Sequence, residues 1–482
     1  MRKIAIQLVA VVMLLSVLVG LSPAASAATT SIDEQLQTIV SDKLAGADVS
    51  IAIRNRTTGE LLYALNGTTS IKPASNMKLL TAAAALDVLG EDYRFKTELY
   101  TSGKIANGVL KGDVYIKGQG DPTLMASDLT QFAHALKAQG ITTIDGRIVG
   151  DDKWFDQDLL TPGIWANDES WYYAAPISAL TTSPNTDYDS GTVIVDVTPG
   201  AVGEAPNVTV TPHIGDLEIV NEAVTVPAGE TRTLYVERAY GTNKIVITGV
   251  LPLARTYRDW ITMQHPTAHT LAMFQEILAQ EGIRYTKHKV FEAATPKSAQ
   301  LIATKQSMPL SELLIPYMKL SNNGIADILV KTMGKVKGNH GSTAAGLKVV
   351  KAYGQSIGLD MNKWLFEDGS GMSHDNRVSS ETVSQLLFAV QQEPWYATYV
   401  TSLPVAGAAN RMVGGTLRTR LTNPITAGNV IGKTGSLTGV AALSGYVHAQ
   451  SGNDYIFSIL VQNKSNAATA IDEMVKVIAS EF

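Results

Sequence analysis

The chain has 482 residues, of which 45% are hydrophobic and 17% are charged, a composition typical of folded globular domains. This length exceeds that of one ordinary domain and predicts two to four. The formal net charge of −5 argues against a nucleic-acid binder, and the lack of cysteine excludes disulfides, thiolate metal sites and a cysteine nucleophile.

Residues 1–27 have the features of a secretory signal peptide. Arg2 and Lys3 precede an apolar run that ends at Leu21, and Ala25-Ser26-Ala27 follows. A basic start, an apolar core and an Ala-x-Ala end predict cleavage after Ala27 and a secreted protein associated with the cell envelope. The alternative is an uncleaved membrane anchor, because the apolar run is almost long enough to span a bilayer. No transmembrane span is expected after cleavage.

The rest of the chain predicts an α/β (α+β) multidomain protein in which an insertion splits one domain. Residues 28–95 contain a hairpin and a helix rich in Ala and Leu, whereas residues 96–258 hold short β-like runs separated by turns. Helical patterning returns in residues 259–482, which close with strands at 440–448 and 455–462 and a final helix. A hairpin near one end and two strands near the other predict one sheet built from both chain ends.

Ser75 and Lys78 are the strongest candidates for chemistry. They lie three residues apart at the start of the first predicted helix, and therefore on one helix face. A serine hydroxyl becomes a good nucleophile when a neighbouring base takes its proton, and a desolvated lysine can be that base. The helix N-terminus also favours the developing negative charge. The pattern alone is weak, since an exposed lysine on an ordinary helix produces the same spacing.

Two further motifs strengthen this interpretation. Ser321-Asn322-Asn323 lies between two apolar helical runs, where a turn would present the first and third side chains. Lys433-Thr434-Gly435 opens a strand-like stretch near the end of the chain. Ser-x-x-Lys, Ser-x-Asn and Lys-Thr-Gly in this order are the motif set of penicillin-interacting serine enzymes.

On these motifs the chain resembles the serine DD-peptidases, or penicillin-binding proteins. Within them it is similar to the low-molecular-mass class C (type-4) D-alanyl-D-alanine carboxypeptidase/endopeptidases. The segments 118–124 and 368–373 and the roughly 240 residues between Ser75 and Ser321 support this resemblance, which covers essentially the whole mature chain. It implies a β-lactamase-like transpeptidase domain, an antiparallel sheet flanked by helices, with the insertion forming two extra domains.

The resemblance also implies catalytic roles. Ser75 would attack the carbonyl between two D-alanines and form an acyl-enzyme, with Lys78 as its base. Ser321 would pass the proton to the leaving amine. The backbone N–H groups of Ser75 and Ser436 would form the oxyanion hole.

The remaining implied residues bind substrate. Asn323 would hold a backbone amide, and Lys433 and Thr434, followed by Gly435, would bind the terminal carboxylate. Members of this family also hold the diaminopimelyl side chain in a pocket, and the matching residues here are Trp165, Asp168, Tyr173, Met372 and Leu437. Close relatives carry an arginine where this chain has His374, and a neutral histidine pairs less strongly with a carboxylate. The natural side chain is therefore expected to lack that charge, for instance through amidation, or to sit more loosely.

The implied partners are peptidoglycan stem peptides as substrates and β-lactam antibiotics as covalent inhibitors, with no nucleic acid. No cofactor or metal is expected. His265 and His269 have the spacing of helical metal ligands, but Pro266 between them favours packing or capping. Two alternatives stay open: a β-lactamase or esterase of the same fold, and a non-catalytic penicillin-binding sensor.

Overall fold

The computed structural model describes residues 31–165, 168–212, 214 and 217–481, so the predicted signal peptide lies outside the described residues. Five antiparallel strands from the two ends of the chain form one sheet, which confirms the prediction of a sheet built from both chain ends. In sheet order they are β2 (Leu61–Leu65), β1 (Asp48–Asn55), β22 (Asp454–Gln462), β21 (Val440–His448) and β20 (Val430–Leu437).

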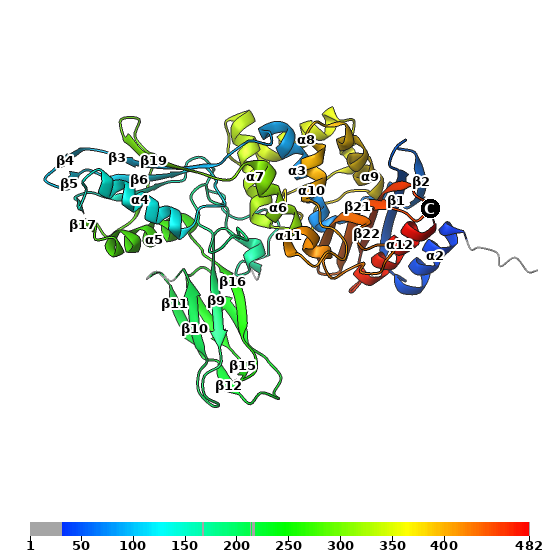
Figure 1. The fold of residues 1–482 in the computed structure, drawn as a ribbon, viewed down its shortest axis with the longest axis horizontal. Helices are drawn as coiled ribbons and strands as arrows, with labels where there is room; N and C mark the ends of the chain where they lie inside the picture. Colours follow the sequence, from blue (N-terminus) through cyan, green and yellow to red (C-terminus); the bar gives the residue numbers. More distant parts are fainter. Residues whose placement is uncertain (1–30, 166–167, 213, 215–216, 482) are drawn as a thin grey trace, which may run out of the picture.

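Both faces of this sheet are covered by helices, as the alternation of side chains along β22 shows. Ile456 and Leu460 belong to one hydrophobic core, and Phe457, Ile459 and Val461 belong to a second one on the opposite face. The second core is closed by α2 (Ile32–Lys43) and α12 (Ala468–Glu481), which lie against each other at the right of Figure 1. The first core is closed by α3 (Met77–Leu89), α6 (Leu310–Lys319), α7 (Asn323–Gly338), α8 (Thr343–Ser356), α9 (Ser380–Ala389) and α10 (Tyr396–Ser402).

Helix α3 is the central helix of this domain. Every residue from Met77 to Leu86 is buried, because Ala and Leu side chains lie on all sides of the helix; the polar Lys78 and Thr81 are buried with them. The helix ends at Leu89, where Gly90 adopts a φ of 85°. A helix enclosed on all sides holds the residues at its start in fixed positions.

The inserted region contains two further hydrophobic cores and projects from the terminal-sheet domain as two bodies (Figure 1). The first body packs α4 (Ala126–Ala138) and α5 (Pro266–Gln280) on a five-stranded sheet. Its strand order is β18 (Phe291–Glu292), β8 (Ile148–Asp151), β6 (Val114–Gly118), β3 (Lys96–Thr101) and β19 (Gln300–Gln306). The second body is built from short strands, among them β9 (Thr192–Thr198), β10 (Asn207–Thr211), β13 (Tyr235–Arg238), β14 (Lys244–Thr248), β15 (Val250–Pro252) and β16 (Tyr257–Thr262).

The domain boundaries stay a prediction, but strand pairing requires one change to them. The boundary expected after residue 258 falls inside β16, which pairs with β9. Further on, β19 pairs with β3 over residues 300–306. We therefore place the return to the terminal-sheet domain at about residue 307. The helical pattern after residue 259 does not mark the return to the terminal-sheet domain, because periodicity predicts a helix but not the sheet against which the helix packs.

Among the described residues, none of the helices combines the length and apolarity needed to cross a membrane. Helix α5 begins at Pro266, with His265 at its N-cap position and His269 buried at 2% exposure. The described residues contain no group of three or more His, Asp or Glu side chains placed to hold a metal ion.

Candidate active site

Ser75 lies in a single 3₁₀ turn, Ala74–Asn76, immediately before α3. This turn is confined from two sides by glycines. A Cβ on Gly371 would lie 2.0 Å from the carbonyl oxygen of Ala74, and one on Gly435 would lie 2.7 Å from that of Pro73. Since only glycine allows both approaches, the backbone before Ser75 is clamped between the 371 turn and strand β20.

A buried side chain adds a third constraint on this turn. The Asn76 amide, which is 0% exposed, donates to the carbonyl oxygen of Lys433 at 3.0 Å. The start of α3 is thereby tied to β20. Ser75 itself is partly exposed and lines a cavity of about 450 Å³.

Lys78 is fully buried and lies next to the Ser75 hydroxyl. Its Nζ is 2.9 Å from Ser75 Oγ, 2.6 Å from Asn323 Oδ1 and 2.5 Å from the carbonyl oxygen of Ser370. The last two are acceptors, so a neutral amine uses its two N–H groups on them and keeps its lone pair for the Ser75 O–H. Burial lowers the Lys78 pKa to about 7, which populates that neutral amine near neutral pH.

Two buried carboxylates, Asp327 and Asp368, oppose this effect of burial, because their negative charges raise the Lys78 pKa. Burial in turn raises the pKa of Asp327 to about 7. The Asp368 carboxylate accepts from the backbone N–H groups of Gly371 and Ser373 at 2.7 and 2.6 Å. These carboxylates were missed as functional candidates in the sequence. A signal existed for Asp327, which lies one helical turn after Asn323 on the same face of α7.

Ser321 and Lys433 form a second serine–lysine pair. Ser321 lies between α6 and α7 with a φ of 62°, a left-handed conformation that non-glycine residues rarely adopt. Lys433 Nζ donates to Ser321 Oγ at 2.8 Å and to the carbonyl oxygen of Thr434 at 2.8 Å. Burial, and next the nearby Lys78 charge, lower the Lys433 pKa well below its usual range. The two hydroxyls and two amines of the motif set are thus brought together.

Asn322, the middle residue of the Ser-x-Asn motif, ties the turn between α6 and α7 to the inserted region. Asn322 donates to the carbonyl oxygens of Asp187 and Tyr188 and to Asp189 Oδ1, at 3.1, 3.0 and 2.9 Å. These residues belong to the inserted region, so that region supports the catalytic turn. On the other side, the Asn323 amide donates to the carbonyl oxygen of Tyr173 at 3.0 Å.

The cavity separates the predicted residues into two groups. The side that faces it is formed by Ser75, Trp165, Asp168, Tyr173, Ser321, Asn323, Met372, His374, Thr434, Ser436 and Leu437. Lys78, Lys433 and Gly435 lie behind this surface, and both lysines are 0% exposed. Thr416 also lines the cavity and pairs with Thr434 through their hydroxyls at 2.7 Å, a contact that no sequence motif indicated.

A stacked ring pair and a hydrogen-bonded tyrosine–aspartate pair line part of the cavity. Trp165 and His374 stack with centroids 4.8 Å apart and planes at 11°. Burial and the nearby Lys72 charge lower the His374 pKa, so its imidazole is largely neutral at pH 7. The Tyr173 hydroxyl donates to Asp168 Oδ1 at 3.1 Å, which leaves this carboxylate at the cavity wall.

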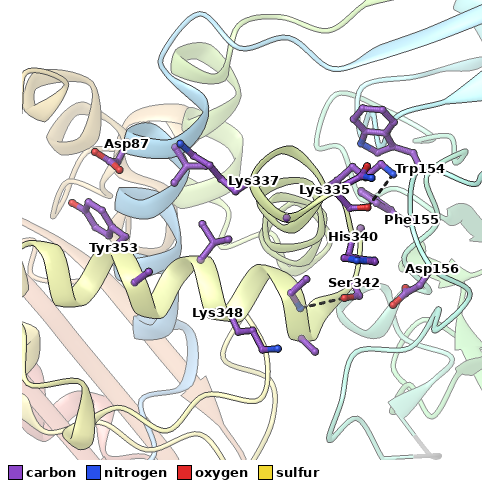
Figure 2. A pocket seen from close by; sticks show the side chains of 18 of the residues that line it. Asp87, Trp154, Phe155, Asp156, Lys335, Lys337, His340, Ser342, Lys348 and Tyr353 are labelled. Carbon is purple, nitrogen blue, oxygen red and sulfur yellow. Dashed lines mark hydrogen bonds between the residues drawn. The ribbon is translucent and has the colours of Figure 1, made fainter.

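A larger cavity, of about 910 Å³, lies elsewhere, between α8, the C-terminal ends of α3 and α7, and the 153–156 loop (Figure 2). Lysines including Lys335, Lys337 and Lys348 border it, and none of the motif residues does. Size therefore does not identify the active site. The smaller cavity is the candidate, because it adjoins Ser75, a nucleophile beside the buried base Lys78.

The antiparallel sheet with helices on both faces, and a serine–lysine pair at the start of its central helix, define a serine acyl-transfer enzyme of the penicillin-interacting class. The family model described as the D-Ala-D-Ala carboxypeptidase 3 (S13) family matches residues 29–481. The chain belongs to this family, which confirms the predicted serine-type D-Ala-D-Ala peptidase and the penicillin-binding fold.

Individual relatives agree. The chain is 39% identical over 485 residues to a D-alanyl-D-alanine carboxypeptidase of Actinomadura sp. (strain R39), covering 98% of this chain and 90% of the relative. It is 29% identical to D-alanyl-D-alanine carboxypeptidase DacB of Haemophilus influenzae, covering 86% and 85%. The crystal structure of penicillin binding protein 4 (dacB) from that organism superposes with a TM-score of 0.81 at 25% identity, covering 92% of this chain and 98% of the other.

Proposed function

We propose that Ser75 is the nucleophile of this carboxypeptidase and Lys78 its general base. One observation carries the proposal: the buried Lys78 amine lies 2.9 Å from Ser75 Oγ with its other two contacts on carbonyl-type acceptors. In the acylation step the proton of the Ser75 hydroxyl moves to Lys78 Nζ while Oγ bonds to the carbonyl carbon between two D-alanines. The resulting oxyanion is stabilised by the N–H groups of Ser75 and Ser436.

Collapse of this intermediate breaks the peptide bond and requires a proton for the leaving D-alanine amine. Ser321 passes this proton on: its hydroxyl proton goes to the amine, and the proton that Lys78 took from Ser75 replaces it, while Lys433 holds the Ser321 oxygen through a 2.8 Å hydrogen bond. Lys78 is then a neutral amine again. Water attacks the ester while its proton moves to Lys78 Nζ, and Lys78 returns this proton to Ser75 Oγ as the ester bond breaks, which regenerates the Ser75 hydroxyl. An oligopeptide that carries a cross-link is hydrolysed by the same steps when the cleft accepts it.

Substrate binding uses the wall that faces the cavity. The Thr434 and Thr416 hydroxyls hold the terminal carboxylate, and Lys433 supports this wall from behind through its hydrogen bond to Ser321, without direct exposure. Asn323 binds a backbone amide of the peptide. Gly435 contributes by its lack of a side chain, which lets β20 approach the nucleophile turn.

The ring-lined part of the cavity binds the side chain of the substrate. Asp168 pairs with its terminal amine, and Trp165, Tyr173, Met372 and Leu437 enclose its apolar part. His374 stacks on Trp165 as a neutral ring and offers no full charge to a side-chain carboxylate. We expect faster hydrolysis of amidated than of free-acid side chains. Equal rates, or a preference for the free acid, would contradict this assignment.

The deciding experiment is the intact mass of the protein after reaction with benzylpenicillin, with Ser75→Ala as the control. A single stoichiometric adduct that is absent in the control supports Ser75 as the nucleophile. Rapid turnover without accumulation favours the β-lactamase alternative, and no reaction of the folded protein favours the sensor. Assays with D-Ala-D-Ala peptides and cross-linked peptides then measure the carboxypeptidase and endopeptidase rates.

Export to the cell envelope is part of the proposal. The basic start, apolar run and Ala-Ser-Ala site support cleavage after Ala27. N-terminal sequencing of the protein released by its host tests this directly. A mature chain that begins at Ala28 supports it, and an intact N-terminus in the membrane fraction supports the anchor.

A further inference from the structure

The described residues expose four aromatic side chains, and all four lie on one surface. Trp165, Tyr172, Tyr235 and Tyr240 are 53%, 44%, 45% and 72% exposed. The first two line the active-site cavity, and the other two line a neighbouring cavity of about 430 Å³. Single exposed apolar side chains are common on protein surfaces, but several large aromatic rings gathered in one place indicate a binding surface.

The two cavities adjoin each other. They share Asp168, and the second is also lined by Trp171 and Glu237. A third cavity of about 570 Å³ shares Glu169 and Tyr240 with the second. We call the surface formed by Trp171, Tyr172, Tyr235, Glu237 and Tyr240 the aromatic track.

The track is held rigidly by strand β13. Its side chains alternate, so that Tyr235 and Glu237 point outward while Val236 and Arg238 are buried. The Arg238 guanidinium pairs with Glu169 at 2.8 Å, and its backbone N–H donates to Ser170 Oγ at 2.6 Å. These bonds join β13 to the segment that leads into the active site, so the track and the cleft keep a fixed relation.

The chemistry of the track selects its ligand. The Trp171 and Tyr235 rings lie edge to face at 5.6 Å and expose apolar surface with a hydroxyl at its edge. Glu237 and Asp168 add hydrogen-bond acceptors, and the one described cation of this lining, Arg238, is already paired. Apolar ring faces beside carboxylates suit the C–H faces and hydroxyl groups of a neutral sugar. They disfavour a polyanion.

We infer that the aromatic track binds the carbohydrate chain to which the stem peptide is attached. This inference rests on the proposed function, since a stem peptide acylating Ser75 brings its attached sugars to the same face. The track then acts as an extended subsite that raises the efficiency of glycan-linked substrates over free peptides.

The test compares three substrates: a stem pentapeptide, a cross-linked peptide dimer without sugars, and the pentapeptide linked to its disaccharide. The ratio of kcat/KM for the disaccharide-linked over the free pentapeptide is measured for wild type and for Tyr235→Ala and Tyr240→Ala. Each alanine variant is expected to lower this ratio by about threefold to tenfold. Tyr240→Phe, which keeps the ring, and Leu253→Ala, an exposed side chain just after β15, are expected to keep it.

A second readout does not need catalysis. Calorimetric titration of Ser75→Ala with peptide-free glycan oligomers is expected to show binding that the added Tyr235→Ala and Tyr240→Ala changes abolish. An unchanged ratio together with no glycan binding would overturn the inference. It would also be overturned if Tyr235→Ala and Tyr240→Ala lowered kcat/KM equally for the sugar-free cross-linked dimer. That result would indicate that the track binds a second peptide. Failure of the proposed function looks different: no substrate is cleaved, while glycan binding is still measurable.

Discussion

The neutral state of Lys78 is the feature of this site that is most open to measurement. A lysine with the ordinary pKa near 10.4 is neutral in only about one molecule in 2500 at pH 7. With the pKa lowered by burial to about 7, about half of the molecules carry the neutral amine. Burial therefore increases the population of competent base roughly a thousandfold at neutral pH.

The wild-type rate constant for acylation by benzylpenicillin should follow this population. We expect it to rise about tenfold per pH unit below pH 7, because protonated Lys78 cannot accept the Ser75 proton, and to level off above about pH 8. Lys78→Arg keeps the positive charge but cannot lose it, so acylation should fall by about 10²–10⁴ and lose this pH dependence.

The assay is stopped-flow or quenched mass measurement of single-turnover acylation between pH 5 and 9. Lys337→Arg, on the exposed end of α7, is the matched control and should behave as wild type. Lys78→Met keeps a similar shape without charge, and thermal unfolding of all variants separates loss of base from loss of fold. A wild-type rate that is flat from pH 5 to 9, or Lys78→Arg within tenfold of wild type, would refute the assignment of Lys78 as a neutral base.

Three further predictions concern the support of the site. Asn76→Ala removes the buried donor to the Lys433 carbonyl and should lower the free energy of unfolding by about 1–3 kcal/mol in denaturant titration, with no change indicating that water replaces the bond. Gly435→Ala should lower the acylation rate at least about tenfold, because its Cβ meets the Pro73 carbonyl and moves β20 from the nucleophile turn; wild-type kinetics would show that the contact is relaxed without cost. Burial raises the folded-state pKa of Asp189 to about 7, so its carboxyl costs stability as pH rises from about 4 to 7; Asp189→Asn should therefore raise Tm relative to wild type more at pH 8 than at pH 5, and an equal change at both would contradict the raised pKa.

Local geometry explains why much of the candidate site could be predicted from the sequence. Residues three apart on a helix share a face, so Ser75 and Lys78 were expected together before any packing was known. The Ser321–Asn323 turn between two helices was also predictable from periodicity. The strand expected to open at Lys433 begins three residues earlier, at Val430. The terminal sheet was predictable for a related reason, since both chain ends carried strand patterns that needed partners.

Tertiary packing determines the remaining features of the site, which are its long-range contacts and the pKa values of its lysines. The acceptor that completes the Lys78 environment is the Ser370 carbonyl, 292 residues away along the chain, and no local pattern records that contact. The burial that shifts the Lys78 pKa, and the opposing charges of Asp327 and Asp368, arise only when these segments meet. The position of Lys433 also depends on packing. The motif predicts a contact with the substrate, whereas in the structure Lys433 is buried behind Ser321.

The sequence by itself therefore determined which side chains are chemically able to react, because their identities and helical spacing are properties of short segments. Tertiary structure alone decided their protonation, their access to the cavity and the extent of the inserted region. Desolvation and strand pairing depend on residues hundreds of positions apart, as in the pairing of β3 with β19. The aromatic track belongs to this second kind: Tyr235 and Tyr240 join the surface of the active site only because β13 packs beside the segment that leads into it.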